Sequence, residues 1–420
     1  MNFEKIKSPI GMNDFFGEKS ELFAYLVKEF ANQAKNYGYS LIITPLVEHV
    51  EVFNRLGKDT DVVSKEMYNF VDKGGRELVL KPESSAAVAR SFVQHNPDIP
   101  WKVWYLSPQF RYERPQKGRY RQHFQLGVEI LGATSFQADV EVIHFLYNFF
   151  NKIGLGPTTE LNINTMGSIE ERPKYKELLL TYFKKHEADL TNSGQWEKAL
   201  NNPIRMLDSK VESLQGLLND APSIKSVSTK ESLEKYEQVL QTLTDCGVEY
   251  VENSRLVRGF DYYSDTTFEF VSSAIDAAQS TIAGGGSYNK LVEELGGKPT
   301  PGIGFGAGVE RWMLALENLS KGTGQVLPTS KCDVFVVGDD SLTAPIVMKL
   351  REANLSVLNS LDDKSFKAQF KQANKANAKL VVIYGADENT RSVVNVKCME
   401  TGNQDEVSLE NLVQEVKQRL

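Results

Sequence analysis

The stretch FRYERPQKGRYRQHFQLGVEILG, residues 110–132, predicts two β-strands joined by a polar, arginine-rich turn. Pro115 and Gly118 within it are residues that favour turns. Successive side chains of a strand point to opposite faces. On the second limb this rule separates Phe124, Leu126, Val128 and Ile130 from His123, Gln125, Gly127 and Glu129. The apolar set can pack on a core, and the other set forms a polar floor with a gap at the glycine.

This polar face, together with Arg111 from the first limb, groups a cation, a carboxylate and an amide. Such a set suits a small zwitterion or a phosphate ester, because it offers charge-assisted hydrogen bonds. The alternative is a solvated antiparallel hairpin with ordinary surface charges. The hairpin alone leaves both interpretations open.

Size and composition indicate a soluble globular protein. The chain has 420 residues, so two or three domains are expected. Its hydrophobic content of 41% and its charged content of 25% are ordinary for that class. The formal net charge of −7 excludes a globally basic nucleic-acid binder, but it leaves room for local basic patches.

Cysteine usage and hydropathy predict a cytoplasmic location. Cys246, Cys332 and Cys398 are widely spaced and odd in number, so they give neither a zinc spacing nor a disulfide framework. Reduced thiols are the simple expectation. The first stretch, MNFEKIKSPIGMNDFF, lacks the apolar segment of a signal peptide, and no run of about 18 apolar residues occurs. We therefore expect no membrane association.

The segments before the hairpin predict helices and strands in alternation. Residues 21–37 place apolar side chains at helical spacing. Residues 40–48 predict a strand that contains Pro45, and such a strand lies at an edge or an interface because proline cannot donate to a ladder. Residues 77–83 predict a second strand. Glu83 ends that strand where a helix begins, which is a common place for functional groups.

Beyond the hairpin, residues 139–153 predict an apolar helix, and residues 168–250 predict short charged helices that we interpret as an insertion. Sheet patterns return at residues 266–271, and residues 284–288 predict a tight turn. Residues 300–308 carry glycine at every second position from 302, which clears one face of a strand for close approach of another group. A close-packed strand is the alternative.

The last part of the chain, residues 331–420, predicts a compact α/β domain of alternating strands and helices. Its middle helix carries Lys367, Lys371 and Lys375 four residues apart, and Lys379 continues the spacing just beyond the helix. Like charges at this spacing repel slightly. The lysine stripe is either a solvated face or a face that meets phosphate.

Five segments give the chain a family resemblance to histidyl-tRNA synthetases of the bacterial type, which are class II aminoacyl-tRNA synthetases. The Pro45 strand resembles the first class II motif, FRYERP with the downstream GVEILG resembles the second, and GIGFGAGVER, residues 302–311, resembles the third. RGFDYY, residues 258–263, resembles the histidine-specific signature. NPIRMLDSK, residues 202–210, resembles a stretch of the family's insertion domain.

The resemblance implies an α+β fold. Residues 1–325 would form a class II catalytic domain with an antiparallel sheet flanked by helices, interrupted by a helical insertion domain at residues 168–250. Residues 331–420 would form an α/β anticodon-binding domain. The implied activity joins L-histidine and ATP to histidyl-adenylate and transfers the histidyl group to the 3′ end of tRNA-His. A homodimer is also implied.

The resemblance further assigns residues to ATP and to the chemistry. Arg111, Arg258 and Arg311 would be catalytic and would contact the phosphates, with Glu113 and His123 completing the ATP site. Arginine suits these positions because it stays charged and presents several donors to phosphate. Mg²⁺ would shield the β- and γ-phosphates, held mainly by ATP oxygens rather than by a protein metal site.

The resemblance also assigns residues to histidine and to tRNA. The resemblance implies a histidine site made of Glu83, Ser85 and Gln125 at the α-amino group, and of Glu129 and Tyr263 at the imidazole, with Tyr262 beside them. Fixing both imidazole nitrogens requires an acceptor and a group that can donate or accept. The implied tRNA contacts are Gln116 and Arg119 in the hairpin turn, and Lys367 and Lys371 in the lysine stripe.

Two positions depart from the family pattern. Ser85 stands where threonine is usual, and it keeps the hydroxyl. His123 and Phe124 stand where the usual order is Phe–His, so an imidazole takes the place of the ring expected to stack on adenine. We expect ATP binding to weaken if His123 becomes protonated, which a change in the KM for ATP between about pH 5.5 and 8 would reveal.

A regulatory paralogue of the family, which works with an ATP phosphoribosyltransferase, is the alternative reading. That class typically lacks the anticodon-binding domain and has a degraded histidine signature. This chain has a C-terminal α/β region, and it retains Arg111, Arg258 and Arg311.

Overall fold

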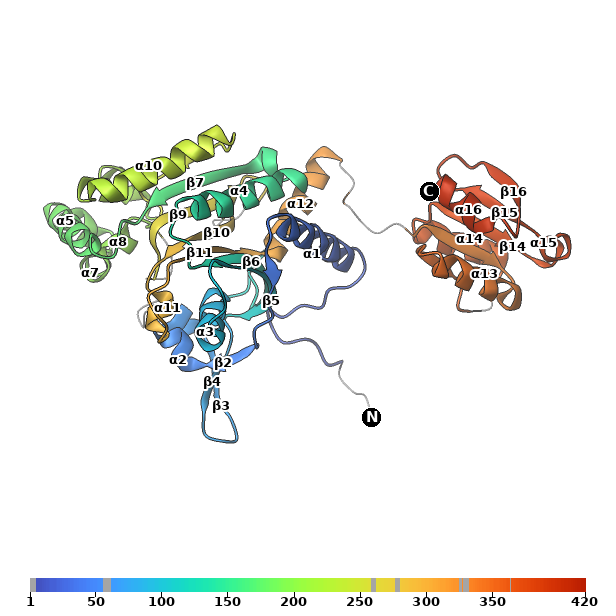
Figure 1. Cartoon of the computed structure of the whole chain (residues 1–420), viewed down its shortest axis with the longest axis horizontal. Helices are drawn as coiled ribbons and strands as arrows, with labels where there is room; N and C mark the ends of the chain where they lie inside the picture. The colour runs from blue at the N-terminus through green and yellow to red at the C-terminus, as the bar shows by residue number, and fades with distance from the viewer. Residues whose placement is uncertain are drawn as a thin grey trace. The chain divides into compact units, whose positions relative to one another are not determined.

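The structure is a computed structural model that describes residues 5–55, 62–257, 262–275, 280–324, 327, 332–362 and 364–420. The chain divides into two compact units, Met1–Pro328 and Thr329–Leu420, which Figure 1 shows in blue to orange and in orange to red. Within the described ranges, no helix has both the length and the apolar character needed to cross a bilayer.

The first unit is built on an eight-stranded sheet of order β1-β5-β6-β11-β10-β9-β7-β8. Its strands are β1 (Ser40–Leu41), β5 (Trp101–Phe110), β6 (Gln122–Leu131), β7 (Thr159–Thr165), β8 (Val251–Glu252), β9 (Ser264–Ser272), β10 (Thr281–Tyr288) and β11 (Gly302–Gly308). The six central strands pair antiparallel, and the short strands β1 and β8 add parallel edges. The predicted antiparallel class II sheet is therefore confirmed, with mixed edges.

A small sheet of order β2-β4-β3 lies beside the main one, made of β2 (Val47–His49), β3 (Tyr68–Val71) and β4 (Glu77–Leu80). The helices around both sheets are α1 (Glu18–Asn36), α2 (Val50–Asn54), a π-helical turn η1 (Val62–Glu66), α3 (Ser85–His95), α4 (Gln137–Lys152), a 3₁₀ turn η2 (Gly156–Thr158), α11 (Leu291–Glu294) and α12 (Val309–Thr323).

Between β7 and β8 the chain forms a group of short helices with its own apolar core, which includes Leu179, Phe183 and Leu218. Its elements are α5 (Arg172–Lys185), α6 (Glu187–Asn192), α7 (Trp196–Asn201), α8 (Pro203–Met206), η3 (Glu212–Leu214), α9 (Gln215–Asn219) and η4 (Ile224–Ser226). We refer to this group as the helical region. The next helix, α10 (Lys230–Asp245), instead packs against α4 and joins the main core.

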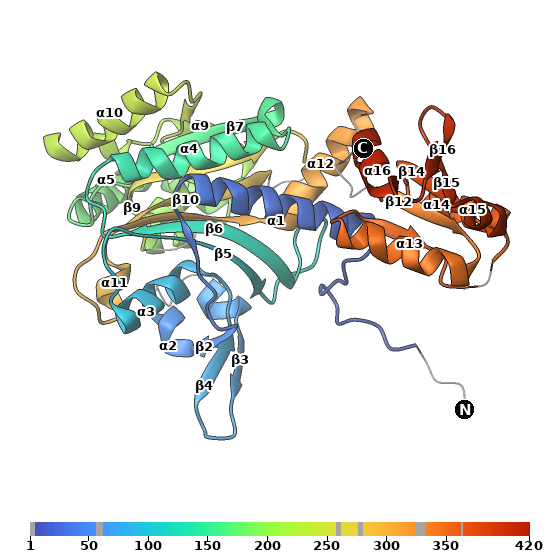
Figure 2. The same cartoon turned by 45° about the vertical axis from the view of Figure 1, so that its right-hand side comes forward.

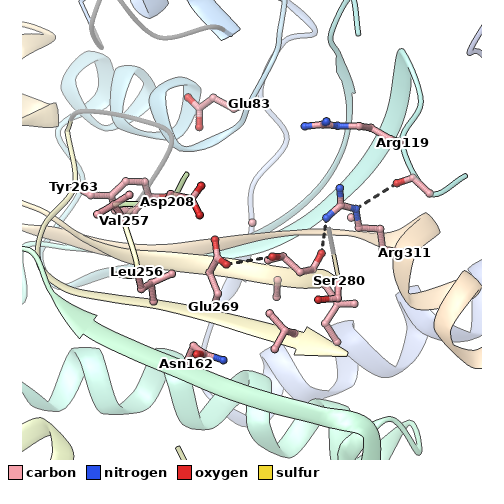
Figure 3. Close-up of a pocket in the computed structure, with 18 of the residues that line it drawn as sticks. Glu83, Arg119, Asn162, Asp208, Leu256, Val257, Tyr263, Glu269, Ser280 and Arg311 are labelled. Carbon is pink, nitrogen blue, oxygen red and sulfur yellow. Dashed lines mark hydrogen bonds between the residues drawn. The ribbon is translucent and has the colours of Figure 1, made fainter. Parts of the chain in front are cut away.

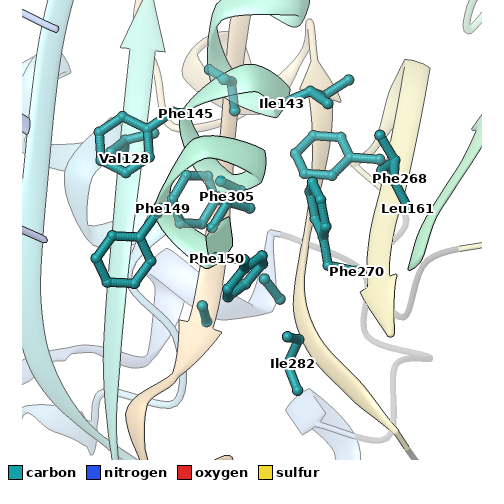
Figure 4. Close-up of a cluster of buried hydrophobic side chains, with 14 of the residues drawn as sticks. Val128, Ile143, Phe145, Phe149, Phe150, Leu161, Phe268, Phe270, Ile282 and Phe305 are labelled. Carbon is teal, nitrogen blue, oxygen red and sulfur yellow. The ribbon is translucent and has the colours of Figure 1, made fainter. Parts of the chain in front are cut away.

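The main core lies on one face of the eight-stranded sheet, under α1, α4 and α12. Figures 1 and 2 show α1 and α4 along this face and α3 on the opposite one. In α4 the apolar side chains recur at helical spacing, which turns Phe145 and Phe149 toward the strands (Figure 4). Phe149 packs on Trp312 with ring centroids 5.0 Å apart. Truncating such a buried ring typically costs about 3–5 kcal/mol.

The predicted hairpin is present as β5 and β6, which pair from Trp101 opposite Leu131 to Phe110 opposite Gln122. This register confirms the predicted alternation of side chains. Leu126, Val128 and Ile130 join the core, and the polar set faces away from it.

Two local predictions were wrong. The strand predicted around Pro45 is two short strands, β1 and β2, in different sheets, and the proline lies between them. Residues 284–288 form no turn, because they belong to strand β10, where three glycines sit between β9 and β11. Glycine runs favour turns when taken alone, but here they let neighbouring side chains cross the sheet face.

The second unit has a five-stranded sheet of order β13-β12-β14-β15-β16 flanked by helices. Its elements are β12 (Val334–Gly338), α13 (Asp340–Glu352), β13 (Val357–Asn359), α14 (Phe366–Lys375), β14 (Leu380–Tyr384), α15 (Ala386–Arg391), β15 (Val393–Cys398), β16 (Gln404–Ser408) and α16 (Leu412–Arg419). The predicted α/β character is confirmed, and the pattern analysis missed the exposed edge strand β16 and the short helix α15.

Candidate functional site

A cavity of about 870 Å³ lies on the polar face of the eight-stranded sheet (Figure 3). Its lining includes ten of the residues predicted from sequence, namely Glu83, Ser85, Arg111, Glu113, Arg119, His123, Gln125, Tyr262, Tyr263 and Arg311. These residues come from segments as far apart in the chain as β4–α3 and α12. The fold therefore brings most of the predicted site into one space.

Four other predicted residues lie elsewhere. Glu129 is fully buried beneath the cavity, and Gln116 is exposed in the hairpin turn. Lys367 and Lys371 are exposed on α14 of the second unit. Arg258 lies outside the described residues, so its predicted role stays a prediction.

The register of the sheet explains which side chains cover the glycines of β11. On β11, Gly304 lies opposite Glu129 and Gly308 lies opposite Gln125 of β6. A Cβ atom at Gly304 would lie 1.7 Å from Glu129 Oε2, and one at Gly306 would lie 1.9 Å from Gln125 Nε2. The groups that approach the glycines are thus side chains of the neighbouring strand, which lie flat across β11.

The gap predicted at Gly127 is filled. The ring of Tyr105, on the adjacent strand β5, covers this glycine, and a Cβ atom there would lie 2.3 Å from the Tyr105 hydroxyl oxygen. That hydroxyl donates a 3.3 Å hydrogen bond to the carbonyl oxygen of Phe305. The floor at this point is therefore an aromatic ring rather than a vacancy.

Glu129 is the most constrained carboxyl group of the site. Its Oε1 accepts a 2.6 Å hydrogen bond from the Ser85 hydroxyl, and its Oε2 accepts a 2.5 Å hydrogen bond from the Tyr288 hydroxyl. Burial raises the pKa of Glu129 to about 8, although both hydroxyl groups act in the opposite direction. At neutral pH this side chain is mostly a neutral acid.

Glu83 lies two residues before the first residue of helix α3. Its two carboxylate oxygens accept hydrogen bonds from the backbone N–H groups of Ser85, at 2.8 Å, and Ala86, at 2.7 Å. Backbone N–H groups at a helix start lack partners within the helix, so a carboxylate there is stabilised. Burial raises the pKa of Glu83, and these two donors oppose the shift. Each oxygen keeps a lone pair for a further donor.

Gln125 lines the cavity together with Glu83. Its buried Oε1 atom has no hydrogen-bond partner among the described residues. A buried acceptor without a partner costs about 1–3 kcal/mol, so a bound donor would be favoured there. The buried rings of Tyr262 and Tyr263 form the adjacent wall, with centroids 4.7 Å apart. We call Glu83, Ser85, Gln125, Glu129 and Tyr288 the carboxyl end of the site.

The opposite part of the cavity, which we call the arginine end, holds Arg111, Arg119 and Arg311 with Glu66 and Glu113. Arg111 Nε donates a 2.9 Å hydrogen bond to the Pro82 carbonyl oxygen, next to Glu83. Arg311, in the first turn of α12, donates to the carbonyl oxygens of Gly118 and Thr281 (Figure 3). Backbone acceptors thus fix these two guanidinium groups without neutralising them.

The carboxyl groups of Glu113 and Glu66 partly balance the positive charge of the arginine end. Glu113 forms a close ion pair with Arg119. Burial, followed by the charge of Glu113, raises the pKa of Glu66. Like-charged neighbours hold each other's protons more tightly. Sequence reasoning missed Glu66, which follows a segment with no recognisable periodicity.

The hairpin turn is closed by two backbone hydrogen bonds between Gln116 and Arg119, of 3.0 and 2.9 Å. Gln116 and Lys117 are exposed at its tip. Arg119 instead turns inward to Glu113. Of the two turn residues predicted to meet tRNA, only Gln116 therefore faces outward.

The exchange of His123 and Phe124 has a clear structural result. Phe124 packs against Phe15 and Phe23 on the core side, with ring centroids 5.9 and 5.0 Å apart, while His123 lines the cavity. Burial, then the nearby Arg111 and Arg311, lower the pKa of His123 to about 3. At so low a pKa the ring is neutral from pH 5.5 to 8, which argues against a change in the KM for ATP within that range. The effect of protonation on ATP binding stays a prediction.

Several residues of the site escaped sequence analysis. Glu269 on β9 and Asn162 on β7 line the cavity, and the buried Tyr288 on β10 bonds to Glu129. Glu310 accepts two hydrogen bonds from the Phe124 N–H, at 2.8 and 3.1 Å, and burial raises its pKa to about 7. The residues of β9 and β10 could have been found from the alternation of side chains along these strands. Alternate residues point to the sheet face on which the glycines of β11 lie.

Comparisons with known proteins agree with this geometry. Residues 11–312 match the family model for histidyl-tRNA synthetase, and residues 331–419 match that for an anticodon binding domain. Two curated relatives are named histidine–tRNA ligase. The one from Geobacillus sp. strain WCH70 is 41% identical over 98% of this chain and 99% of its own, and that from Marinomonas sp. strain MWYL1 is 39% identical over 99% of each chain.

A solved structure gives the same result. The apo histidyl-tRNA synthetase of S. aureus superposes with a TM-score of 0.79 at 33% sequence identity. The match covers 98% of this chain and all of that one. Similarity in sequence and in fold therefore extends through both units.

Proposed function

The chain belongs to the histidyl-tRNA synthetase family, and on that basis we propose that it is a histidine–tRNA ligase. It activates L-histidine with ATP and transfers the histidyl group to the 3′ end of tRNA-His. The observation that carries the proposal is the cavity itself, which joins a carboxyl end built for a small polar molecule to an arginine end built for phosphates. Full-length similarity to named ligases supports it.

In the first step a carboxylate oxygen of histidine attacks the α-phosphorus of ATP, and the bond to the β-phosphate oxygen breaks to release pyrophosphate. Charge builds up on the α-phosphate oxygens, and fixed cations stabilise it. Arg111 is suited to this role because its backbone acceptor holds it beside the carboxyl end. Arg311 serves the outer phosphates, and Arg258 is assigned to the α-phosphate by family resemblance.

Histidine recognition uses the carboxyl end. Glu83 and the unpaired Oε1 atom of Gln125 accept hydrogen bonds from the α-ammonium group. Glu129 faces the imidazole, and its pKa of about 8 lies close enough to that of imidazole for the two groups to share one proton. A site built to hydrogen-bond its substrate rejects analogues that lack the group by roughly 10⁴-fold. Such discrimination makes a separate editing site unnecessary.

The arginine end takes ATP, with His123 lying against the adenine. Glu113 and Glu66 offer the oxygen ligands that Mg²⁺ prefers, and the cation would otherwise be held by phosphate oxygens. When bound, it neutralises charge on the β- and γ-phosphates. Arg119 belongs with this group rather than with the tRNA contacts, since its side chain pairs with Glu113 inside the cavity.

The domain plan follows the family. Residues 1–325 are the catalytic domain, residues 168–250 are a helical insertion domain within it, and residues 331–420 are the anticodon-binding domain. The lysine stripe of α14 is exposed and suits the RNA backbone. Lys371→Glu should therefore raise the KM for tRNA severalfold without changing amino-acid activation. The same change at Lys417 on α16 is the matched control. Equal effects from both variants would show that the lysine stripe is not a specific tRNA contact.

A homodimer is the proposed assembly. The segment around Pro45 exposes apolar side chains, with Leu41 53% exposed, Ile43 83% and Leu46 42%. Clusters of this kind mark protein interfaces. Ile43→Asp should shift the protein from dimer to monomer in analytical ultracentrifugation. An enzyme that charges tRNA acts where translation takes place, so we propose a cytoplasmic location.

The decisive experiment is ATP–pyrophosphate exchange in the presence of each amino acid. We expect exchange with L-histidine only. The competing candidate, a regulatory partner of an ATP phosphoribosyltransferase, predicts no exchange with any amino acid. The match of residues 331–419 to an anticodon binding domain favours the ligase.

A further inference from the structure

Helix α3 begins without the hydroxyl cap that its sequence offers. Ser84 directly precedes the helix, where a serine side chain usually accepts a hydrogen bond from a free N–H group of the first turn. Here Ser84 makes no such bond, and the carboxylate of Glu83 takes the N–H groups of Ser85 and Ala86 instead. The hydroxyl group of Ser84, a residue that is 1% exposed, is therefore left to bind elsewhere.

The partner of Ser84 is Gln109, near the end of strand β5. Gln109 Nε2 donates a 2.5 Å hydrogen bond to the Ser84 hydroxyl oxygen. A backbone bond joins the same two segments, since the Phe110 N–H group donates to the Lys81 carbonyl oxygen at 2.9 Å. The end of β5 is thus tied to the chain on both sides of Glu83.

The amide group of Gln109 is fully buried and only partly used. Its Oε1 atom has no hydrogen-bond partner among the described residues. A buried polar atom without a partner lowers stability, whereas two apolar side chains of similar shape would fill the same space without that cost. Packing alone therefore does not account for a glutamine at this position. Its hydrogen bond to Ser84 does.

Ser84 lies between two residues of the carboxyl end, because its chain neighbours Glu83 and Ser85 both line the cavity. A shift of Ser84 would move both of these side chains with it. Gln109 is not among the described residues that line the cavity. Two routes lead from it to a ligand, one through Ser84 and one through His123, which lies opposite Gln109 on β6.

We propose that Gln109 is a positioning residue for histidine, which holds Ser84 and thereby fixes Glu83 and Ser85 toward the amino acid. The inference rests on the proposed function, because that function assigns the carboxyl end to histidine. The route through Ser84 is favoured because a hydrogen bond joins the two side chains directly. Gln109 does not touch the amino acid. It sets the place from which Glu83 accepts the α-ammonium group.

A double-mutant cycle between positions 109 and 84 tests the proposal. Gln109→Met nearly keeps the volume of the side chain, and Ser84→Ala removes only a hydroxyl group. Each variant should raise the KM for histidine in ATP–pyrophosphate exchange about tenfold, the value for one lost hydrogen bond, while the KM for ATP changes less than about twofold. The double variant should show the same rise of about tenfold and not about a hundredfold, because both changes remove one contact.

Stability separates positioning from packing. Either single variant leaves a buried polar group without its partner, so urea unfolding should show a loss of stability. In the double variant neither partner of this hydrogen bond remains, and stability should return toward that of the wild type. The KM for histidine should stay raised. A role in packing alone would restore the stability and the KM together.

Gln33→Met is the matched control. Gln33 on α1 is also buried, and its Nε2 atom donates a 2.5 Å hydrogen bond to the Phe145 carbonyl oxygen in the main core. This variant should lose stability without a change in the KM for histidine. If Gln109→Met does not fold, Gln109→Asn takes its place in the cycle, because it keeps the amide group but shortens its reach by one carbon.

Four results would overturn the proposal. An unchanged KM for histidine in Gln109→Met would mean that the contact fixes nothing in the site. Single effects that multiply in the double variant would separate Gln109 from Ser84. A rise in the KM for ATP alone would assign Gln109 to His123. An equal rise in the KM for histidine in Gln33→Met would reduce the effect to a general loss of stability.

Failure of the ligase function itself would look different. In that case the wild type would show no histidine-dependent exchange. The same cycle can then be measured by calorimetric titration of the protein with L-histidine. Histidine binding that weakens about tenfold in both single variants would keep the role of Gln109, and equal binding by all variants would refute it.

Discussion

The two ends of the cavity differ in burial and in charge. At the carboxyl end, Glu83 and Glu129 are 3% and 0% exposed, and their oxygens accept hydrogen bonds from uncharged N–H and O–H groups. At the arginine end, Arg111, Arg119 and Arg311 are half-buried and face carboxylates and backbone carbonyl groups. At the carboxyl end burial raises the pKa of both carboxyl groups, whereas the arginine end is charged and open to a counterion.

The difference shows how one sheet can treat two parts of a reaction separately. Discrimination among amino acids requires fixed hydrogen bonds in a dry place, because unpaired buried groups penalise the wrong ligand. Stabilising a transferring phosphate requires cations that are already in position and still unneutralised. Changes at the carboxyl end should therefore act on histidine, and changes at the arginine end should act on ATP and on the rate.

The largest effect is expected at Arg111. Arg111→Ala should lower the rate of histidine-dependent ATP–pyrophosphate exchange by roughly 10³-fold, because it removes a fixed cation beside the transferring phosphate. Arg114→Ala, an exposed arginine of the same stretch that does not line the cavity, is the matched control and should stay within twofold. A comparable loss in both variants would mean that overall charge, and not the position of Arg111, drives the reaction.

Glu129→Gln should weaken histidine binding while leaving ATP binding nearly unchanged. The amide has the same shape, but it cannot accept at both of its atoms, so the hydroxyl group of Ser85 or Tyr288 loses its acceptor. We expect the KM for histidine to rise about 50-fold, which corresponds to about 2 kcal/mol, within the usual cost of a buried group left without its partner. The KM for ATP should change less than threefold. Equal increases in both constants would break the division between the ends.

The same variant should change the pH dependence of stability. The pKa of Glu129 is raised to about 8 in the folded protein from the ordinary 4.5, so the folded state binds more protons than the unfolded state between these values. The resulting stability is fully present below about pH 4.5 and is lost as pH rises through 8. Urea unfolding of the wild type should lose on the order of 2 kcal/mol more than Glu129→Gln between pH 6 and 9. Parallel curves would show that Glu129 is already ionised at pH 6.

The smallest effect is expected at His123. Because its pKa is about 3, the KM for ATP should stay flat from pH 5.5 to 8. His123→Phe should lower that KM two- to fivefold, since a larger ring stacks better on a base. A tenfold rise in the KM on acidification of the wild type, absent in His123→Phe, would show that the ring titrates and that the arginine end is wetter than the structure implies.

Local patterns were sufficient for much of this architecture. Side-chain periods within a few residues are enough to predict the hairpin and the position of Arg311 at the start of α12. They also predict the change from strand to helix near Glu83. Tyr288 was not predictable in this way, because its bond to Glu129 joins residues 159 positions apart. The glycines before it also favour a turn when read locally, and only pairing with β9 and β11 makes them a strand.

The electrostatic state of the site was the least predictable part. Sequence reasoning placed His123 at the nucleotide and expected it to titrate near neutral pH. Its pKa depends on burial and on Arg111 and Arg311, which the fold brings from separate segments. The inward turn of Arg119 depends in the same way on Glu113. Motifs identify which groups are present, but the packing around them decides which are charged.

The contact between Gly127 and Tyr105 limits how this protein can vary. The smallest residue of β6 and a fully buried tyrosine of β5 share one volume, so neither position can change alone without a clash or a void. An alanine at 127 would also lie 2.3 Å from the backbone carbonyl oxygen of Phe305, so a smaller side chain at 105 would not make room for it. In directed evolution of substrate preference position 127 should therefore be kept as glycine, whatever residue stands at 105.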